Sequence, residues 1–302
     1  MNSIYTDASK RHDFVLLFDV TDGNPNGDPD NDNLPRTDPE TGQGIVTDVC
    51  LKRKVRDYVS VMKINQPGYK IYIQKKDIAL NAKHELAYSA LDIKTTGTKQ
   101  KKDDVDKAQK WMCENFYDVR AFGAVMTTGV NCGQVRGPFQ LTFARSLDRV
   151  FSHDITITRV AITKKEDAEV IVGDDEKAKG KQTEMGRKAL VPYGLYMGHG
   201  FFNPLLAEGT GFSNEDLEVF WEALKNMFEL DRSASRGLMA LRGLYIFSHE
   251  SKYGNAPAHK LFERISARLR DESGVPRRFE DYEITVDAEG LPEGISLSQN
   301  MV

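Results

Sequence analysis

The residues best suited to binding chemistry gather in one loop near the start of the chain. Residues 21–44, TDGNPNGDPDNDNLPRTDPETGQG, hold Gly, Pro, Asn and Asp at a density typical of a long functional loop. Gly23 and Gly27 would let the main chain come close to a phosphate, and Asn side chains both donate and accept hydrogen bonds, as ribose hydroxyls require. The loop therefore suits a backbone nest for a phosphate or a ribose.

The same loop has two other interpretations. Asp22, Asn24, Asn26 and Gly27 match the opening of a helix–loop–helix calcium site, but Asn33 stands where that motif needs a Glu, and a strand pattern precedes the loop. A solvated turn is the third interpretation. The acidic residues of the loop count against the nest unless they point away from the ligand or contact a neighbouring protein copy.

A basic helix is predicted directly after the loop, over about 47–63, with Thr47 as its N-cap. We expect one apolar stripe to face the core: Leu51, Val55, Tyr58, Val59 and Met62. The helical period places Lys52, Arg56 and Lys63 along one flank, with Arg53 further toward solvent. Phosphates laid across the loop would meet this flank and make binding salt-sensitive, although a solvated helix face explains the flank equally well.

The bulk composition narrows the class of protein. The net charge of -4 is unusual for a nucleic-acid binder, but residues 1–48 hold ten Asp or Glu and only three Lys or Arg, so a basic face can be hidden in the total. No stretch is long and apolar enough to span a membrane, and the start lacks a secretion signal, so we expect a cytoplasmic protein. Three dispersed cysteines and six dispersed histidines favour neither a disulfide framework nor a metal site, and no cofactor is expected.

Hydrophobic periodicity predicts the elements that position the loop. A buried strand is expected at 14–20, and residues 64–134 read as an insertion with a strand near 69–76 and helices near 85–91 and 103–116. The next strand, 135–146, alternates an apolar side with a polar side: Val135, Phe139, Leu141 and Phe143 against Arg136, Gln140 and Thr142. Arg136 and Gln140 are either ordinary surface residues or RNA contacts.

Residue patterns also predict the elements in the second half of the chain. Residues 151–188 read as a protruding hairpin with a mobile tip, and strands are expected at 190–197 and 237–249. Between them, Ser213 and Asp216 cap a helix with a buried stripe of Leu217, Phe220, Trp221, Leu224, Met227 and Phe228. Without the insertions, the order is strand, helix, strand, strand, helix, strand. This order predicts an α+β fold with a ferredoxin-like topology, which is also that of the RNA-recognition module (RRM).

The chain resembles the large backbone subunit of Type I-C CRISPR Cascade complexes over nearly its whole length. The most specific segment is residues 18–59, FDVTDGNPNGDPDNDNLPRTDPETGQGIVTDVCLKRKVRDYV. Moderately specific segments follow in the expected order at 118–126, 134–146, 184–196 and 232–262. The resemblance implies a hand-shaped protein of one palm domain with insertions over 1–302. The expected parts are helical fingers at 64–134, a thumb hairpin at 151–188 and a C-terminal extension at 251–302 packed on the palm.

The resemblance also implies what the chain does. It would bind CRISPR guide RNA along its backbone, stack head to tail with further copies of itself and with other Cascade subunits, and present the guide to target DNA for antiviral defence. Cutting would be left to a recruited helicase-nuclease, so the chain itself would not be an enzyme. The alternative is an RNA-cleaving subunit of a Type III-like complex, since the loop holds Asp22, Asp28, Asp30 and Asp32.

Carried over by position, the resemblance implies a set of RNA-binding residues. They lie in the loop, the first helix, the strand after the insertion and the return of the thumb: Asn24, Asn26, Gly27, Arg36, Lys52, Arg53, Arg56, Arg136, Arg187 and Lys188. Ile162 and Met185 are the thumb residues that could wedge between bases at a kink in the RNA.

Overall fold

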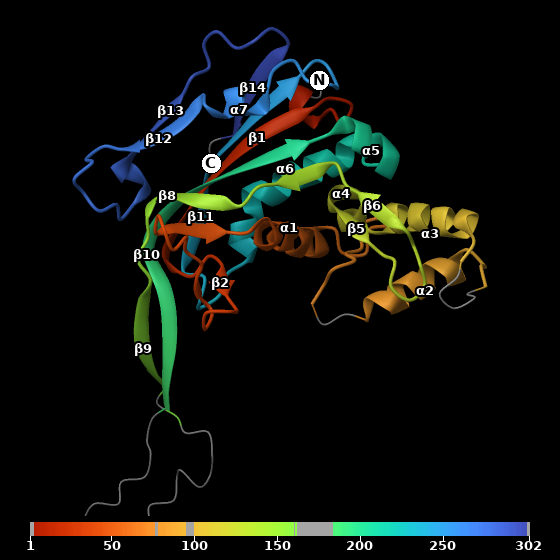
Figure 1. Ribbon diagram of the computed structural model, residues 1–302, viewed down its shortest axis with the longest axis horizontal. Coiled ribbons are helices and arrows are strands. Elements are labelled where there is room, and N and C mark those ends of the chain that lie inside the picture. Colours follow the sequence, from red (N-terminus) through yellow and green to blue (C-terminus); the bar gives the residue numbers. More distant parts are fainter. Residues whose placement is uncertain (1–2, 76–77, 95–99, 160, 162–183, 301–302) are drawn as a thin grey trace, which may run out of the picture.

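The computed structural model describes residues 3–75, 78–94, 100–159, 161 and 184–300 of the 302-residue chain. Figure 1 shows a central sheet with helices packed on it, a helical lobe to one side and a long hairpin that projects away from the body. The predicted α+β class is confirmed.

The central sheet is antiparallel and is built around β1 (His12–Gly23). Its neighbours are β10 (Glu184–Phe202) and β11 (Leu238–His249), and the strand order is β14-β11-β1-β10-β8-β4. The outer strands are β14 (Ile295–Asn300), β8 (Ala144–Arg149) and β4 (Gln43–Val46), and β7 (Phe139–Leu141) also pairs with β10. The predicted strand at 14–20 lies at the centre of this sheet. Its residues are apolar from Phe14 to Phe18 without alternation because both faces of β1 are buried.

Helices α1 (Asp48–Met62) and α6 (Asn214–Leu230) share one hydrophobic core with the side chains on one face of the sheet. Thr47 caps α1 as predicted, and Ser213 with Asp216 forms the predicted capping box of α6. The expected stripe of α6 is buried throughout, and so are Leu51, Val55, Tyr58 and Val59 of α1. The prediction for Met62 is wrong. Its side chain is exposed because the last turn of α1 extends past the core.

The helical lobe contains α2 (Leu80–Ala90), α3 (Lys102–Asn115), α4 (Tyr117–Phe122) and the short pair β5 (Gly123–Val125) and β6 (Gln134–Arg136). It has a small core of its own, which includes Tyr88, Met112 and Cys132. The two predicted helices are confirmed, but the predicted strand near 69–76 is wrong. Among the described residues of this segment, only Lys70 makes a β-bridge. The amides of Tyr72 and Ile73 donate to the carboxylate of Asp118 instead of to a neighbouring strand.

The single strand predicted at 135–146 is three strands, β6, β7 and β8. Gly137 and Pro138 separate β6 from β7, and Pro lacks the N–H group that a continuous ladder needs. Arg136 and Gln140 are both exposed as expected, but they lie on different strands. Phe143 is also exposed, which contradicts its expected place on the apolar side.

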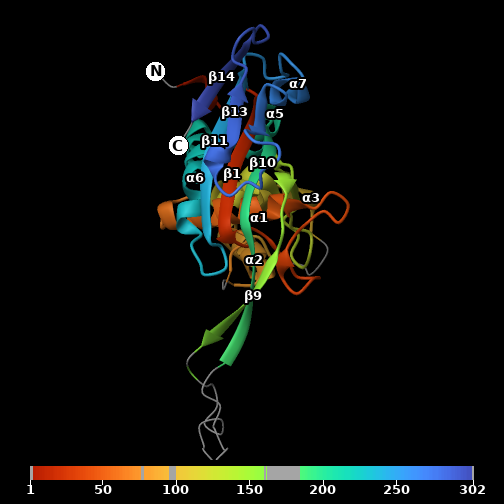
Figure 2. The same ribbon diagram turned by 90° about the vertical axis from the view of Figure 1, so that its left-hand side faces the viewer.

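A long hairpin leaves the sheet as predicted. β9 (His153–Arg159) pairs with the first part of β10, with Ile157 opposite Gly186, and β10 then continues into the central sheet without a break. Figures 1 and 2 both show this hairpin projecting away from the body. The expected tip of the hairpin lies outside the described residues, apart from Ala161.

The C-terminal segment covers the other face of the sheet. It comprises α7 (Ala258–Phe262), β12 (Ile265–Leu269) and β13 (Tyr282–Val286), which pairs with β12, and a short 3-10 helix, η3 (Phe279–Asp281). Leu261 and Ile265 pack with Val15, Tyr245 and Phe247 of the sheet. Protein side chains therefore fill this face of the sheet.

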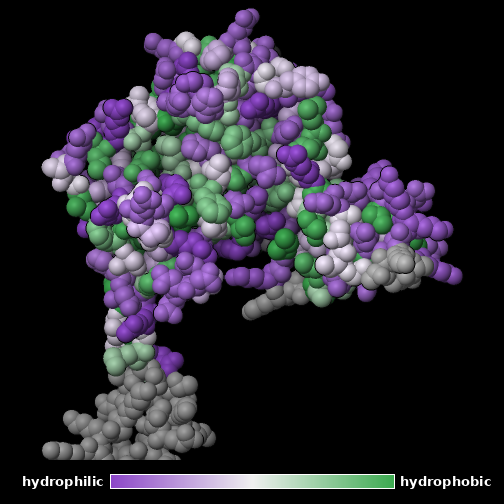
Figure 3. Space-filling view, viewed as in Figure 1, coloured by the Kyte–Doolittle hydropathy of each residue, from purple (hydrophilic) through white to green (hydrophobic). Residues whose placement is uncertain are grey.

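Four short elements complete the fold: η1 (Ile4–Thr6), β2 (Gly27–Asp28), β3 (Leu34–Pro35) and α5 (Pro204–Thr210). Within the described part of the chain, no helix has the length and apolar character to cross a membrane. On the face in Figure 3, hydrophilic residues cover most of the upper rim and of the α3 region.

Candidate nucleic-acid interface

The 21–44 loop is hydrogen-bonded to the start of α1. Asn26 Oδ1 accepts from the backbone N–H of Thr47 at 2.9 Å and from its hydroxyl at 3.0 Å, while the hydroxyl of Thr47 accepts from the N–H of Cys50. The N–H of Arg36 in turn donates to the carbonyl of Asn26 at 3.1 Å. These bonds place the loop against the first turn of a 15-residue helix, where the positive end of the helix dipole favours an anion.

The loop is also closed on itself. Nδ2 of Asn24 donates to the carbonyl of Asn33 at 2.8 Å, and Asn24 is buried. A Cβ atom on Gly27 would stand 2.1 Å from Oδ1 of Asn33, so only glycine fits there. Asp32 and Asn33 have positive φ, as tight turns require. Asn24 and Gly27 therefore set the shape of the loop.

The loop does not have the context of the calcium motif. The element before it is strand β1, where that motif has a helix. Over the residues that the structure describes, no group of three or more His, Cys, Asp and Glu side chains could hold a metal ion.

Arg36 is the only arginine of the loop, and its side chain is partly exposed. Its Nη1 lies 3.1 Å from Oδ1 of Asp28, and both side chains are partly exposed. Nε of Arg36 and Oδ1 of Asn24 are both buried without a hydrogen-bond partner among the described residues. The Nε–H group of Arg36 is thus a donor with no acceptor among the described residues.

The basic residues of α1 face different surroundings. Lys52 makes an i,i+4 pair with Asp48, with Nζ 3.0 Å from Oδ2, and Arg53 binds Asp57 and both oxygens of Asp231. Burial alone would lower the pKa of Arg53, but the charge of Asp231 outweighs it, and this pKa is raised. Lys63 lies 3.6 Å from Glu215. The side chain of Arg53 is 26% exposed, whereas that of Lys52 is 13% exposed and its Nζ lies over the ring of Phe122.

Arg56 is placed differently. Its side chain is buried, with Nε 2.8 Å from Oδ2 of Asp118 and the guanidinium over the ring of Phe122. A contact with RNA would require this buried pair to open, which costs several kcal/mol, on the order of 3 to 5. Its position points to a role in joining α1 to the helical lobe.

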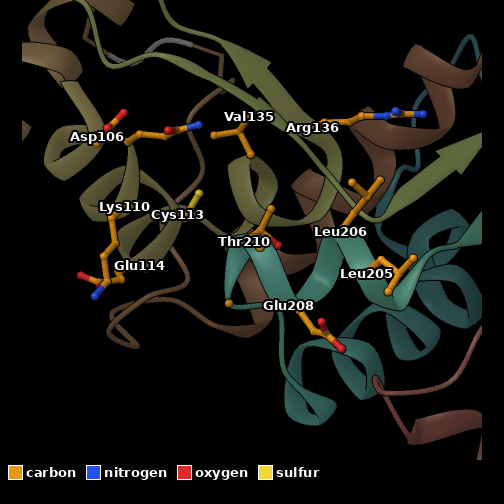
Figure 4. Close-up of a pocket in the computed structure, with 13 residues that line it drawn as sticks. Asp106, Lys110, Cys113, Glu114, Val135, Arg136, Leu205, Leu206, Glu208 and Thr210 are labelled. Atoms are coloured by element: carbon orange, nitrogen blue, oxygen red, sulfur yellow. The ribbon is translucent and has the colours of Figure 1, made fainter. Parts of the chain in front are cut away.

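Arg136 lies in the helical lobe at the edge of a pocket of about 500 Å³ between α3 and α5. Figure 4 shows its side chain pointing away from Lys110 and Glu114 on the far wall. The structure gives Arg136 no ion pair within the described part of the chain, so its charge is available to a ligand.

The residues expected in the thumb lie on two faces of the β9–β10 hairpin. Arg187 is opposite Thr156 and Lys188 is opposite Ile155, so these neighbours in a strand point to opposite faces. Met185 shares the face of Arg187 and is 77% exposed. Arg187 lies 3.5 Å from Asp154 in an exposed pair. Ile162, the other wedge residue, lies outside the described residues.

Comparison with known proteins gives the family. Residues 10–287 match the family described as CRISPR-associated protein Cas7. The chain belongs to this family. A protein of Haloferax volcanii named CRISPR-associated protein Cas7 is 28% identical over 240 residues, which are 72% of this chain. The match spans 64% of that relative, which is less than two thirds of its length.

Two solved structures are similar to this Cas7-family chain. One is a chain of a CRISPR RNA-guided surveillance complex, pre-nicking, with a TM-score of 0.47 and 14% identity, covering 78% of each chain. The other is a chain of a CRISPR RNA-guided surveillance complex, with a TM-score of 0.41 and 14% identity. It covers 78% of this chain and 68% of that one.

Sequence reasoning missed two residues of this Cas7-family chain that hold the loop in place. Arg236 donates to the carbonyls of Asn24 and Pro25, and Asp231 contacts Arg236 as well as Arg53 and Lys54 of α1. Both lie about 200 residues after the loop, between α6 and β11, so no local spacing could reveal these contacts.

Proposed function

We propose that this Cas7-family chain is a backbone subunit that binds CRISPR guide RNA along its sugar–phosphate backbone. The observation that carries the proposal is the 21–44 loop, hydrogen-bonded to the first turn of α1 with Arg36, Lys52 and Arg53 around it. Backbone amides and cations of this kind suit phosphates of any sequence. Base recognition would then come from pairing of the guide with target DNA.

The residues of the interface have different roles in this proposal. Arg36, Lys52, Arg53 and Arg136 contact the RNA, while the loop residues Asn24, Asn26 and Gly27 provide the shape that receives it. Arg56 is left out because it is buried against Asp118.

The β9–β10 hairpin would serve as the thumb, over 151–188. Arg187 would hold a phosphate near the kink in the guide, and Met185 on the same exposed face is the wedge that the structure supports best. Lys188 would lie on the opposite face, toward another partner. Ile162 stays a second wedge hypothesis.

The proposal extends to the parts of the hand and to the partners. The strand order β11-β1-β10-β7 supports a ferredoxin-like palm, with fingers at 64–134 and a C-terminal extension at 251–302 packed on it. Copies would stack head to tail into a helical filament, because a heterologous contact that does not close generates a helix. Other Cascade subunits, and a helicase-nuclease that cuts the DNA, would join the assembly.

We propose that the chain itself does not cut RNA. Asp28, one of the four loop aspartates, is paired with Arg36, which supports a binding role for this part of the loop. Guide RNA incubated with the protein and Mg²⁺ should be recovered intact. Cleavage that is lost in Asp→Ala variants of the loop would support the Type III-like alternative.

The double substitution Arg36→Gln, Lys52→Gln tests RNA binding. We expect the affinity for single-stranded RNA to fall about tenfold or more and the salt slope to decrease by about 1.4, since each phosphate contact contributes about 0.7 to that slope for single strands. Fluorescence anisotropy at several salt concentrations measures both quantities.

Lys110→Gln is the matched control, because Lys110 is 80% exposed on α3, away from the loop. It should leave the slope unchanged. If the double variant binds RNA with the affinity and salt slope of the unmodified chain, the loop and α1 are not the interface.

A further inference from the structure

One carboxylate after the end of α6 connects α1 with the root of the 21–44 loop. Asp231, the C-cap of α6, binds Lys54 Nζ, and both of its oxygens lie 3.0 Å from Nη2 of Arg53. Its Oδ2 also lies 3.4 Å from Nε of Arg236. Burial would raise the pKa of Asp231, but Lys54 and Arg53 outweigh it and lower this pKa, so the carboxylate stays ionised at neutral pH.

Arg236 connects Asp231 with the loop. Its Nη1 donates to the carbonyl oxygens of Asn24 at 2.9 Å and Pro25 at 3.1 Å, and the N–H of Asn24 donates to the carbonyl of Ser235 at 2.7 Å. Nε and Nη1 of Arg236 are therefore both engaged inside the protein, on Asp231 and on the loop.

The two segments also leave no room between them. A Cβ atom on Gly23 would stand 1.9 Å from the carbonyl oxygen of Arg236. Gly237 has φ of 60°, and a Cβ atom there would stand 2.3 Å from the carbonyl oxygen of Thr21. Residues 231–237 thus hold the start of the loop by close packing as well as by hydrogen bonds.

We infer that Asp231 and Arg236 are positioning residues for RNA binding, which hold the 21–44 loop against α1 and orient Arg53 without touching the RNA. This inference rests on the proposed function and adds two residues to it. Arg53 is the link, because Asp231 binds it through two oxygens and the RNA would meet its exposed side.

The sign of one substitution separates positioning from simple electrostatics. An anion beside an RNA-binding surface repels phosphates, so Asp231→Asn should strengthen binding if only the charge matters. A positioning residue predicts the opposite. Loss of the carboxylate leaves three cations without their shared partner and loosens the loop, and we expect affinity to fall about tenfold although the chain has become more positive.

Asp57→Asn is the matched control. Asp57 also binds Arg53, and its substitution removes the same charge, but no contact joins Asp57 to Lys54, Arg236 or the loop within the described residues. The full chain would be titrated against a fluorescein-labelled single-stranded oligouridylate. Asp57→Asn should bind as tightly as the unmodified chain or more tightly. An Asp231→Asn chain that binds as tightly as Asp57→Asn overturns the inference.

Two further measurements test the inference independently of the RNA affinity of Asp231→Asn. Arg236→Lys keeps the charge but cannot reach both carbonyls and Asp231 together, so we expect weaker RNA binding at unchanged net charge. Full affinity of Arg236→Lys would contradict positioning even if Asp231→Asn fails to fold.

Hydrogen exchange without RNA should be faster at residues 24–36 in Asp231→Asn and unchanged in Asp57→Asn. If the unmodified chain retains no RNA, the proposed function fails, while the exchange rates still decide whether these residues hold the loop.

Discussion

At the scale of single residues, equal charges have unequal surroundings. Lys52 and Arg53 keep exposed surface, Lys54 is buried on Asp231, and Arg56 is buried on Asp118. Burial lowers the pKa of Lys54, against the pull of Asp231. Lys54 and Arg56 are buried because Asp231 and Asp118, which lie more than 50 residues away from α1 in the chain, bind them. Their charges are therefore less accessible to a phosphate than the charge of Arg53 is.

His12 provides a residue-scale prediction for acid stability. It is buried, with Nδ1 2.9 Å from the hydroxyl of Ser248 and Nε2 2.9 Å from the carbonyl of Asp7, and burial lowers its pKa from 6.5 to about 4. The unfolded chain therefore binds a proton between about pH 6.5 and pH 4 that the folded chain does not, so stability from this group is present above pH 6.5 and is lost as the pH falls. The loss approaches about 3 kcal/mol at pH 4.

Urea unfolding of the unmodified chain and of His12→Gln at both pH values measures this effect. The stability of His12→Gln should fall by about 3 kcal/mol less over the same range. An equal fall in both proteins would show that His12 does not titrate as its burial implies.

At the scale of elements, buried ion pairs hold the helical lobe against α1 and α6. Asp118 of α4 binds Arg56 of α1 and accepts from the amides of Tyr72 and Ile73. Arg120 of α4 binds both oxygens of Asp216 in the capping box of α6, at 2.9 and 2.6 Å. One short helix thereby contacts both helices of the main core through charge, a geometry that specifies orientation as well as contact.

Asp118→Ala should destabilise the protein by about 3 to 5 kcal/mol, because it leaves Arg56 buried without a partner and two backbone amides without acceptors. Thermal or urea unfolding measures the change. Glu114→Ala removes an exposed partner of Lys110 in the same lobe and should change stability by no more than about 0.5 kcal/mol. Similar stability losses in the two variants would mean that the buried pair does not hold the lobe.

The elements that could be predicted from the sequence are those whose hydrophobic pattern or capping residues lie within one continuous segment. Thr47 and the α1 stripe, Ser213 with Asp216, and the apolar run of β1 each carry their signal within one segment. The 69–76 segment reads as a strand because its alternation is real, but Asp118 takes its amides. The loop residues were found from composition, whereas the roles of Arg56, Asp231 and Arg236 depend on contacts that only the folded chain brings together.

At the scale of the whole molecule, the sheet is covered on both faces. α1 and α6 pack on one side, and α7 with β12 and β13 packs on the other, so Val15, Leu17 and Tyr245 have no exposed surface. Bases cannot stack on this sheet as they do on an RNA-recognition module. Under the proposed function, RNA would therefore follow the edge where the 21–44 loop meets α1. The hairpin projects beyond this edge (Figure 1).

An electron cryomicroscopy map of the full chain assembled on guide RNA tests this claim most directly. We predict RNA backbone density within hydrogen-bonding distance of Arg36, Lys52 and Arg53, with the β12–β13 face free of RNA. RNA traced along β12 and β13, with none beside the loop, would contradict the account.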